Sequence, residues 1–193
     1  MALENINILF SSLEAICSLS IPFRKALEGA AQIRLLQRKA TLLSEGGIQH
    51  SLWFIIQGYA REYQNDPLNW AESTNWFWQS GEFVFHNGLL KKQRSEVSID
   101  FYSGAIIFEI DLISLSENLE ISEELNSVIT TLLEFNTRLR AHHIDDLLKL
   151  NRRDHVKKFY SKHQMLFNFV RHKDLASFFR IRDKSIYRYL KHL

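Results

Sequence analysis

The sequence predicts an α+β protein in which a β-sandwich or closed β-barrel precedes one long helix and a basic helix-turn-helix. Three observations support this prediction. The first half holds short apolar runs between turn residues, thirty residues without proline or glycine follow at 121–150, and the last twenty residues have helix-turn-helix spacing. A chain of 193 residues with 46% hydrophobic content can bury a sizeable core.

Two helices are expected before the strands. Pro22 is suited to the first turn of a helix running toward Ala31, because the backbone N–H that proline lacks is unpaired there anyway. The opening helix is predicted by apolar residues at helical spacing, among which the single cysteine is expected in the core: Ile6, Leu9, Phe10, Leu13, Ile16 and Cys17.

The segment from Ile33 to Leu112 consists of short apolar runs punctuated by turn signals such as Gly46–Gly47 and Asn87–Gly88. Many short strands at this spacing are typical of a sandwich or a closed barrel. The expected strands are 33–36, 41–43, 52–56, 59–63, 75–78, 83–85, 97–101 and 105–110.

A long helix is predicted over about 121–150. Its apolar residues recur at alternating steps of three and four, which lays one seam along the helix, and Ile129 and Leu133 widen that seam. One row can pack on the barrel while the other meets a partner helix, so a parallel homodimer is favoured; packing of the helix on its own sheet alone is the alternative. The seam expected at the dimer interface is Leu125, Val128, Leu132, Phe135 and Leu139.

The helix-turn-helix is predicted between His172 and Lys191. Ala176 offers the small side chain that a close crossing of two helices needs, and Arg180 occupies the turn position that requires positive φ and is usually glycine. An ordinary amphipathic helical hairpin is the alternative. The residues expected around the crossing are Leu175, Phe179, Ile181, Ile186 and Tyr189.

The second of these helices is expected to contact DNA. Arginine and lysine bind guanine edges or phosphates, and hydroxyl groups suit either target. Asp183 is expected to cap this helix rather than to touch DNA. The predicted DNA-binding residues are Arg182, Lys184, Ser185, Tyr187, Arg188 and Lys191.

Charge is divided unevenly along the chain. Residues 151–193 hold twelve lysines and arginines against three aspartates, a net charge of +9, whereas the first 150 residues carry −7. A basic module on an acidic body is the distribution expected of a polyanion-binding protein.

Several classes are disfavoured. No run of eighteen apolar residues and no basic N-terminal region occur, so we expect a cytoplasmic protein without a membrane span. One cysteine supports neither a disulfide framework nor an iron–sulfur cluster. His142 and His143 point about 100° apart on a helix and cannot share a metal, His50 and His86 lack ligand neighbours, and no phosphate loop or nucleophile elbow is present. Neither an enzyme nor a metal site is therefore predicted.

The order of these parts resembles the Crp/Fnr family of bacterial transcription regulators, in particular a divergent Bacteroidetes-type branch. The pieces that carry the resemblance are Thr41–Gly46, Leu52–Gly58, Asn75–Trp78 leading to Gly81–Phe83, Ser98–Asp100, Phe108–Ile110 and the terminal helix-turn-helix. The resemblance implies a cyclic-nucleotide-binding-like double-stranded β-helix, or jelly roll, with flanking helices at 1–115. It further implies a dimerisation helix at 116–150 and a DNA-binding domain at 151–193.

The resemblance also implies partners. We expect a homodimer that reads a palindromic site in double-stranded DNA, with RNA polymerase as a further partner that the resemblance allows. The helix-turn-helix lacks an evident wing, and α-helical cations before it are expected to contact the phosphate backbone instead: Arg152, Arg153, Lys157 and Lys158. The alternative function is a ligand-binding or protein-interaction module with a basic helical tail and no sequence-specific DNA binding.

A cyclic nucleotide is not expected as the effector. In nucleotide-binding relatives an arginine pairs with the cyclic phosphate and a glutamate accepts from the ribose. Here Arg94–Ser95 matches the pair of residues that binds the phosphate, but His86 or Asn87 stands at the position of the glutamate. An unidentified small molecule, anionic or apolar, is the alternative effector, and haem binding at His50 or His86 is not expected. The residues expected at the effector pocket are Trp76, Trp78, Phe83, Phe85, His86, Arg94 and Ser95.

Overall fold

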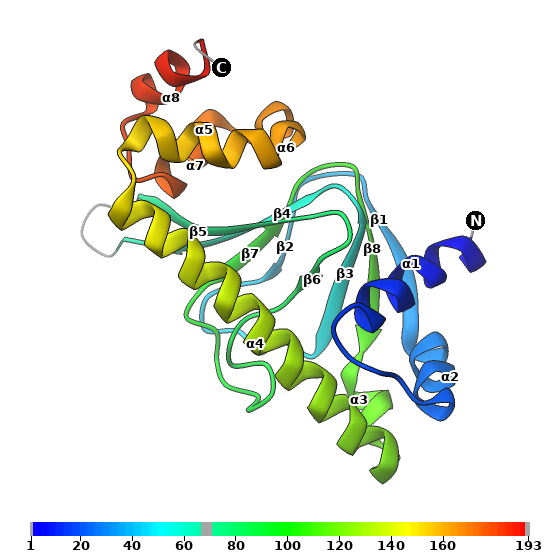
Figure 1. The fold of residues 1–193 in the computed structure, drawn as a ribbon. Coiled ribbons are helices and arrows are strands. Elements are labelled where there is room, and N and C mark those ends of the chain that lie inside the picture. The colour runs from blue at the N-terminus through cyan, green and yellow to red at the C-terminus, as the bar shows by residue number, and fades with distance from the viewer. Residues whose placement is uncertain (1, 67–70, 192–193) are drawn as a thin grey trace.

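The structure is a computed structural model that describes residues 2–66 and 71–191, with the backbone alone for residues 2–5. A β-sandwich occupies the centre, two short helices and the start of a long helix cover one of its faces, and four helices lie beyond the far end of the long helix (Figure 1). The helices are α1 Ala2–Glu14, α2 Ile21–Ala30, α3 Leu112–Ser116, α4 Leu119–Lys149, α5 Arg152–Lys162, α6 Gln164–Phe169, α7 His172–Phe178 and α8 Asp183–Leu190.

The sandwich consists of two four-stranded antiparallel sheets, in the orders β1-β8-β3-β6 and β2-β7-β4-β5. All eight expected strands are confirmed, within a few residues at their ends. The strands are β1 Ala31–Leu36, β2 Ala40–Leu43, β3 Ser51–Gln57, β4 Tyr59–Asn65, β5 Glu72–Gln79, β6 Phe83–Val84, β7 Ser98–Phe101 and β8 Ala105–Asp111. The fold is that of a cyclic-nucleotide-binding jelly roll with added helices.

A core of alternating strand residues fills the space between the two sheets. Trp53 and Ile55 face inward from β3, and Phe101 meets them from β7, with its ring 5.8 Å from that of Trp53 in edge-to-face contact. The β3–β4 turn depends on Gly58, whose φ is +108° and where a Cβ would lie 2.9 Å from the Ala105 Cα. A larger residue would therefore disturb both the turn and the β8 strand behind it.

A second core covers the outer face of the β1-β8-β3-β6 sheet. Leu9 and Leu13 of α1 and Phe23 of α2 pack there with the first half of α4. Ser20 fixes the start of α2 by accepting from the Phe23 N–H at 3.1 Å, and Pro22 lies in the first turn as predicted. The central strands β8 and β3 are thus covered on both faces, whereas most of the edge strand β1 is exposed.

The long helix α4 has 31 residues and a length of about 46 Å at 1.5 Å per residue. Asn118 begins it by accepting hydrogen bonds from the backbone N–H groups of Glu120 and Ile121. The helix runs obliquely past the sandwich, and α5–α8 follow at its C-terminal end (Figure 1). Within the described ranges, no helix combines the length and apolarity that crossing a membrane requires.

Candidate nucleic-acid interface

Helices α5–α8 form a small unit around a third apolar core, which we call the helical head. Ala176 on α7 has no exposed surface, and it lies where α7 meets α8, whose Ile186 is equally buried. The small side chain allows the close approach that the spacing predicted. The other buried members from these helices are Val156, Leu166, Phe167, Val170, Leu175, Phe178 and Phe179.

The turn between α7 and α8 has the predicted geometry. Arg180 adopts φ of +55°, the left-handed conformation usually left to glycine, and the Ile181 N–H donates to the Ala176 carbonyl at 2.9 Å. The expected capping role of Asp183 is wrong. Arg182 holds the N-cap position with no side-chain cap hydrogen bond, and Asp183 is the first helical residue, so its carboxylate lies in the first turn near the positive end of the helix.

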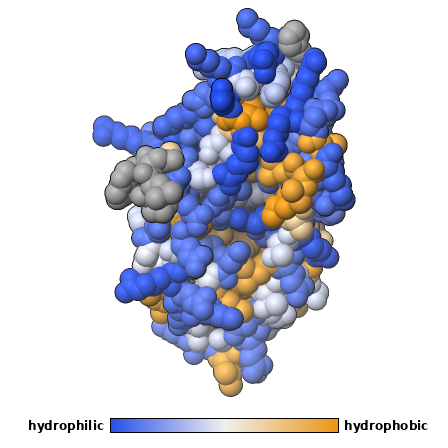
Figure 2. Space-filling view, turned by 90° about the vertical axis from the view of Figure 1, so that its left-hand side faces the viewer, coloured by the Kyte–Doolittle hydropathy of each residue, from blue (hydrophilic) through white to orange (hydrophobic). Residues whose placement is uncertain are grey.

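The predicted DNA-binding side chains share the open side of α8. Ile186 points into the head, so the other face of the helix is free to contact a ligand. The end of the molecule that carries α5–α8 is predominantly hydrophilic on the face seen in Figure 2. Arg182, Lys184, Tyr187, Arg188 and Lys191 are exposed, and Ser185 is half-buried.

The four cations expected at the phosphate backbone lie at the start of the head, in α5. All four are exposed, but two already have partners. Lys158 pairs with Asp146 of α4 at 2.7 Å, and Arg152 donates to the Leu147 carbonyl at 3.1 Å. Arg153 and Lys157 have no ion-pair partner within the described part of the chain, so they are the freer pair for phosphate.

A buried ion pair fastens the head to the outer face of the β2-β7-β4-β5 sheet. Arg61 of β4 donates from Nη1 to Asp174 of α7 at 2.5 Å, and Arg171 binds the same carboxylate through Nε at 2.8 Å. The Tyr102 hydroxyl donates to Oδ2 of Asp174 at 3.0 Å. Burial, together with this carboxylate, raises the pKa of Tyr102. Glu72 accepts from Arg61 at 2.6 Å, and the cation keeps its pKa low despite burial.

Apolar and backbone contacts reinforce this junction. Phe77 of β5 meets Phe178 of α7 with ring centroids 5.2 Å apart, and the Thr74 N–H donates to the Ser177 hydroxyl at 2.8 Å. The guanidinium of Arg180, at the turn itself, donates to Ser73. The first helix of the helix-turn-helix is therefore held on the barrel as well as on its own core.

No pattern in the sequence predicts this junction. The one residue that could have indicated it is Arg61, a charged residue within a segment that otherwise reads as a buried strand. An arginine there needs a buried partner, but its partner lies 113 positions away. Consecutive strand residues point to opposite faces, and Glu62 accordingly reaches α4, where both its oxygens accept from Arg140 at 2.7 and 2.9 Å.

The residues expected at one effector pocket are divided among several cavities. A cavity of about 220 Å³ at the β6–β7 loop is lined by His86 and Arg94. Phe83 and Phe85 line a groove of about 430 Å³ between α4 and the end of α1. Trp76 and Trp78 line this groove and also a cleft under the helical head. Ser95 lines none of these three cavities, and its hydroxyl donates to the Val97 carbonyl at 2.7 Å.

In the cavity at the β6–β7 loop, His86 presents a hydrogen-bond donor, whereas a nucleotide site has an acceptor for the ribose. His86 is buried, which lowers its pKa, and its Nδ1 accepts from the Gly88 N–H at 3.1 Å. The remaining proton of the neutral ring is thus placed on Nε2, which is buried and has no partner among the described residues. A donor therefore stands at His86, which together with Asn87 is one of the two positions that the resemblance matches to a ribose-accepting glutamate. Arg94, the residue that matches the phosphate ligand, donates to the Gly46 carbonyl at 2.8 Å.

The five seam residues of α4 have different surroundings. Leu125, Val128 and Leu132 are buried in the chain's own second core. Phe135 and Leu139 are 41% and 36% exposed, and Ile144 and Leu148 further along α4 are more exposed still, so apolar surface is available to a second copy along the second half of the helix. Within the described ranges, no group of three or more histidine, cysteine or acidic side chains is placed to hold a metal ion.

Comparison with known proteins supports the fold assignment. No protein-family model matches the chain, and no curated protein matches it significantly. Solved structures of regulators do match: the c-di-GMP responsive global regulator CLP from Xanthomonas campestris has 16% identity and a TM-score of 0.66, covering 90% of this chain and 91% of that one. FixK2 from Bradyrhizobium japonicum has 12% identity and a TM-score of 0.65, covering 84% of each chain.

A third match is the Thermus thermophilus Catabolite Activator Protein, with 20% identity and a TM-score of 0.53, covering 94% of this chain and 86% of that chain. Another, described as a transcriptional regulator of the Crp/Fnr family from Eubacterium rectale, has 13% identity and a TM-score of 0.63, covering 90% of this chain and 83% of that chain. The chain therefore shares the fold of these regulators over 84–94% of its length.

Proposed function

We propose that this chain is a transcription regulator of the Crp/Fnr type, a homodimer that binds a palindromic site in duplex DNA through α8. One observation carries the proposal: a helix-turn-helix with a small residue at its crossing, a left-handed turn and an exposed cationic second helix stands at the end of a long helix on a regulator fold. Its partners are double-stranded DNA and a second copy of the chain, and its place is the cytoplasm. No catalytic role is proposed.

The dimer places two reading helices on one duplex. Phe135 and Leu139 supply the apolar surface for α4 of the second copy, and the two-fold axis then runs beside α4. In such an assembly the two α8 helices would enter successive major grooves about 34 Å apart. Arg153 and Lys157 are proposed to add phosphate contacts at the edge of each half-site.

The effector, if it occupies the barrel, is proposed to be something other than a cyclic nucleotide. The donor at His86 Nε2 replaces the acceptor that the ribose hydroxyl needs, and Arg94 already binds a backbone carbonyl. RNA polymerase is a proposed downstream partner on the basis of the resemblance alone.

Selection from random duplexes tests the DNA-binding proposal. The full chain is incubated with a pool of random double-stranded DNA, bound molecules are sequenced, and the enriched sequence is measured by fluorescence anisotropy at two salt concentrations. We expect a palindrome with half-sites about ten base pairs apart, and an affinity that falls steeply with salt. Equal affinity for the enriched and the scrambled duplex would favour the alternative, an interaction module whose basic tail binds without sequence preference.

A further inference from the structure

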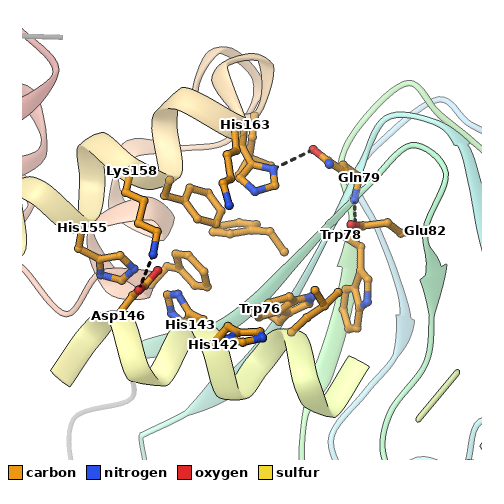
Figure 3. A pocket seen from close by; sticks show the side chains of 16 residues that line it. Trp76, Trp78, Gln79, Glu82, His142, His143, Asp146, His155, Lys158 and His163 are labelled. Atoms are coloured by element: carbon orange, nitrogen blue, oxygen red, sulfur yellow. Dashed lines mark hydrogen bonds and ion pairs between the residues drawn. The ribbon is translucent and has the colours of Figure 1, made fainter. Parts of the chain in front are cut away.

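A cleft of about 200 Å³ lies where the barrel, the long helix and the helical head meet (Figure 3). Its walls come from β5, from α4 and from α5–α7, so the barrel, the long helix and the helical head all contribute to it. The cleft is separate from the cavity at the β6–β7 loop, with which it shares no lining residue. Drug-sized ligands occupy about 300–1,000 Å³, so a ligand of this cleft has only one or two rings.

The inner walls of the cleft are aromatic. Trp76 and Trp78 form the barrel side, and Phe178 forms the head side, where the His143 ring stacks on it at 4.1 Å and 11°. Phe159 adds a further ring, 5.2 Å from Phe178. Trp76 and Phe178 also meet edge to face at 6.2 Å, so these rings form one continuous aromatic wall. Such a wall favours a flat aromatic ligand, because ring contacts in stacked or edge-to-face geometry add to the gain from burial.

The charges around the cleft favour an anion. Lys158 and Lys162 lie at its edge; the first pairs with Asp146 at 2.7 Å, and the second has no ion-pair partner in the described parts of the chain. Glu82 also lines the cleft, where its carboxylate accepts from the Gln79 N–H at 2.8 Å, and burial raises its pKa to about 7, which reduces its repulsion of an anion near neutrality. A cationic ligand is disfavoured because Arg140 already lies over the rings of Trp76 and Trp78, 5.2 and 5.6 Å from their centroids.

A buried nitrogen at the far end of the cleft lacks a partner. His155 is 1% exposed, and its Nδ1 has no hydrogen bond within the described residues. Figure 3 shows this ring beside Asp146 and Lys158, at the edge where α4 and α5 approach each other. Buried polar atoms in native proteins rarely remain unpaired, and a bound ligand or water is one way to satisfy them.

We propose that this cleft binds a small aromatic carboxylate, with its ring against the aromatic wall and its carboxylate near Lys162. A single negative charge matches one free ammonium group better than a phosphate does. The ligand contacts the barrel, α4 and the head together, so it binds the docked head more tightly than a displaced one and stabilises this arrangement. This regulatory consequence rests on the proposed function, whereas binding itself does not.

Binding to the full chain without DNA tests the site. The probe is 2-naphthoate, followed by isothermal titration calorimetry, with neutral 2-naphthamide as the matched control for charge. We expect 2-naphthoate to bind about tenfold more tightly than the amide, the equivalent of one charge-assisted hydrogen bond. Equal affinities, or no heat from either compound at millimolar concentration, would overturn the proposal.

Three substitutions locate the probe. Lys162→Gln is expected to weaken 2-naphthoate binding about tenfold and to leave 2-naphthamide unchanged. Two control substitutions are expected to leave 2-naphthoate binding unchanged. Lys157→Gln lies on the same helix but outside the cleft, and Arg94→Gln lies in the cavity at the β6–β7 loop. Loss of binding in Arg94→Gln but not in Lys162→Gln would place the ligand elsewhere and reject the cleft. DNA binding is measured separately, so a chain that binds DNA but not 2-naphthoate loses only this inference.

Discussion

Arg61 on the barrel and Asp174 on the helix-turn-helix form an ion pair of 2.5 Å whose two side chains are 1% and 3% exposed. The pair joins a strand of the sensor-like domain to the first helix of the proposed DNA-binding unit. Charges this deeply buried are tolerated because Glu72, Tyr102 and Arg171 supply further hydrogen bonds to the two groups.

Replacing one partner of this pair should destabilise the protein strongly. Asp174→Asn leaves the Arg61 guanidinium buried beside a neutral amide, and breaking a buried pair in this way typically costs about 3–5 kcal/mol. Urea unfolding of the full chain measures the loss. Asp145→Asn, which removes only the exposed pair with Lys149, is the control and should change the free energy of unfolding by about 0.5 kcal/mol or less. Similar losses in the two variants would show that the junction is not closed in solution.

The proposed reading residues should differ from the proposed phosphate contacts. Arg182→Ala and Arg188→Ala are expected to cost about 1–3 kcal/mol on the selected duplex and to relax its sequence preference. Lys157→Ala is expected to weaken all duplexes alike and to reduce the salt slope by about one. Anisotropy titrations on selected and scrambled DNA measure both effects. The assignment of α8 as the reading helix fails if all three variants lose the same affinity on both duplexes.

The exposed middle of α4 should control the oligomeric state. Phe135→Glu places a charge in the apolar surface proposed for the second copy, so we expect it to convert a dimer into a monomer without loss of folding, as Phe135 lies outside the chain's buried core. Light scattering after size exclusion gives the mass. Thr137→Glu, an exposed substitution two residues further on and on another face of the helix, should leave the mass unchanged. A monomeric parent protein would contradict the proposed dimer directly.

Acid should weaken the junction of α4 with the head. Burial, and then the nearby His155, lower the pKa of His143 to about 4, below the 6.5 of an exposed histidine. The unfolded chain therefore binds more protons between these values, so the free energy of unfolding is retained above pH 6.5 and falls as pH decreases toward 4. His143→Phe keeps the stacking on Phe178 and should reduce this slope, measured by urea unfolding at several pH values. His142→Phe, at the exposed neighbouring position, should keep the parent slope.

The left-handed turn at Arg180 should accept glycine and reject a β-branched residue. Arg180→Gly removes backbone strain of about 1–2 kcal/mol but increases the freedom of the unfolded chain by a similar amount, so little net change is expected beyond the loss of the Ser73 contact, which Arg180→Val loses as well. Arg180→Val retains the strain and adds crowding at Cβ, so a clear loss is expected. Thermal unfolding compares the two. A valine variant as stable as the glycine variant would mean that the turn is not left-handed in solution.

Most helices and strands could be predicted from the sequence, but the contacts between the barrel, the long helix and the helical head could not. The strands and the turn at Arg180 could be predicted because each depends on residues close in sequence: alternation, a glycine, a small residue at a crossing. The cap at Asp183 failed by one position, since a helix start is decided by the geometry of the preceding turn.

The part of the candidate site that could be predicted is the exposed side of a single helix, α8. The exposed side of α8 follows from helical spacing around Ile186, so its cations could be named in advance. The junction of Arg61 with Asp174, and the cleft with His143 and Phe178, join residues from three separate segments. No local pattern contains such pairs. The single expected effector pocket divided into several cavities because its residues come from separate segments, the end of β5, the β6 strand and the β6–β7 loop, which face different hollows.

Fastening the head to the barrel has a consequence for the DNA that a dimer could use. Domains tethered by a loose linker can follow half-sites at different separations, whereas heads locked to two rigid bodies keep one separation and one relative rotation. Each added base pair would turn the second half-site by about a tenth of a helical turn, away from a head unable to follow. The operator of such a protein would tolerate base changes at its edges better than a single insertion at its centre.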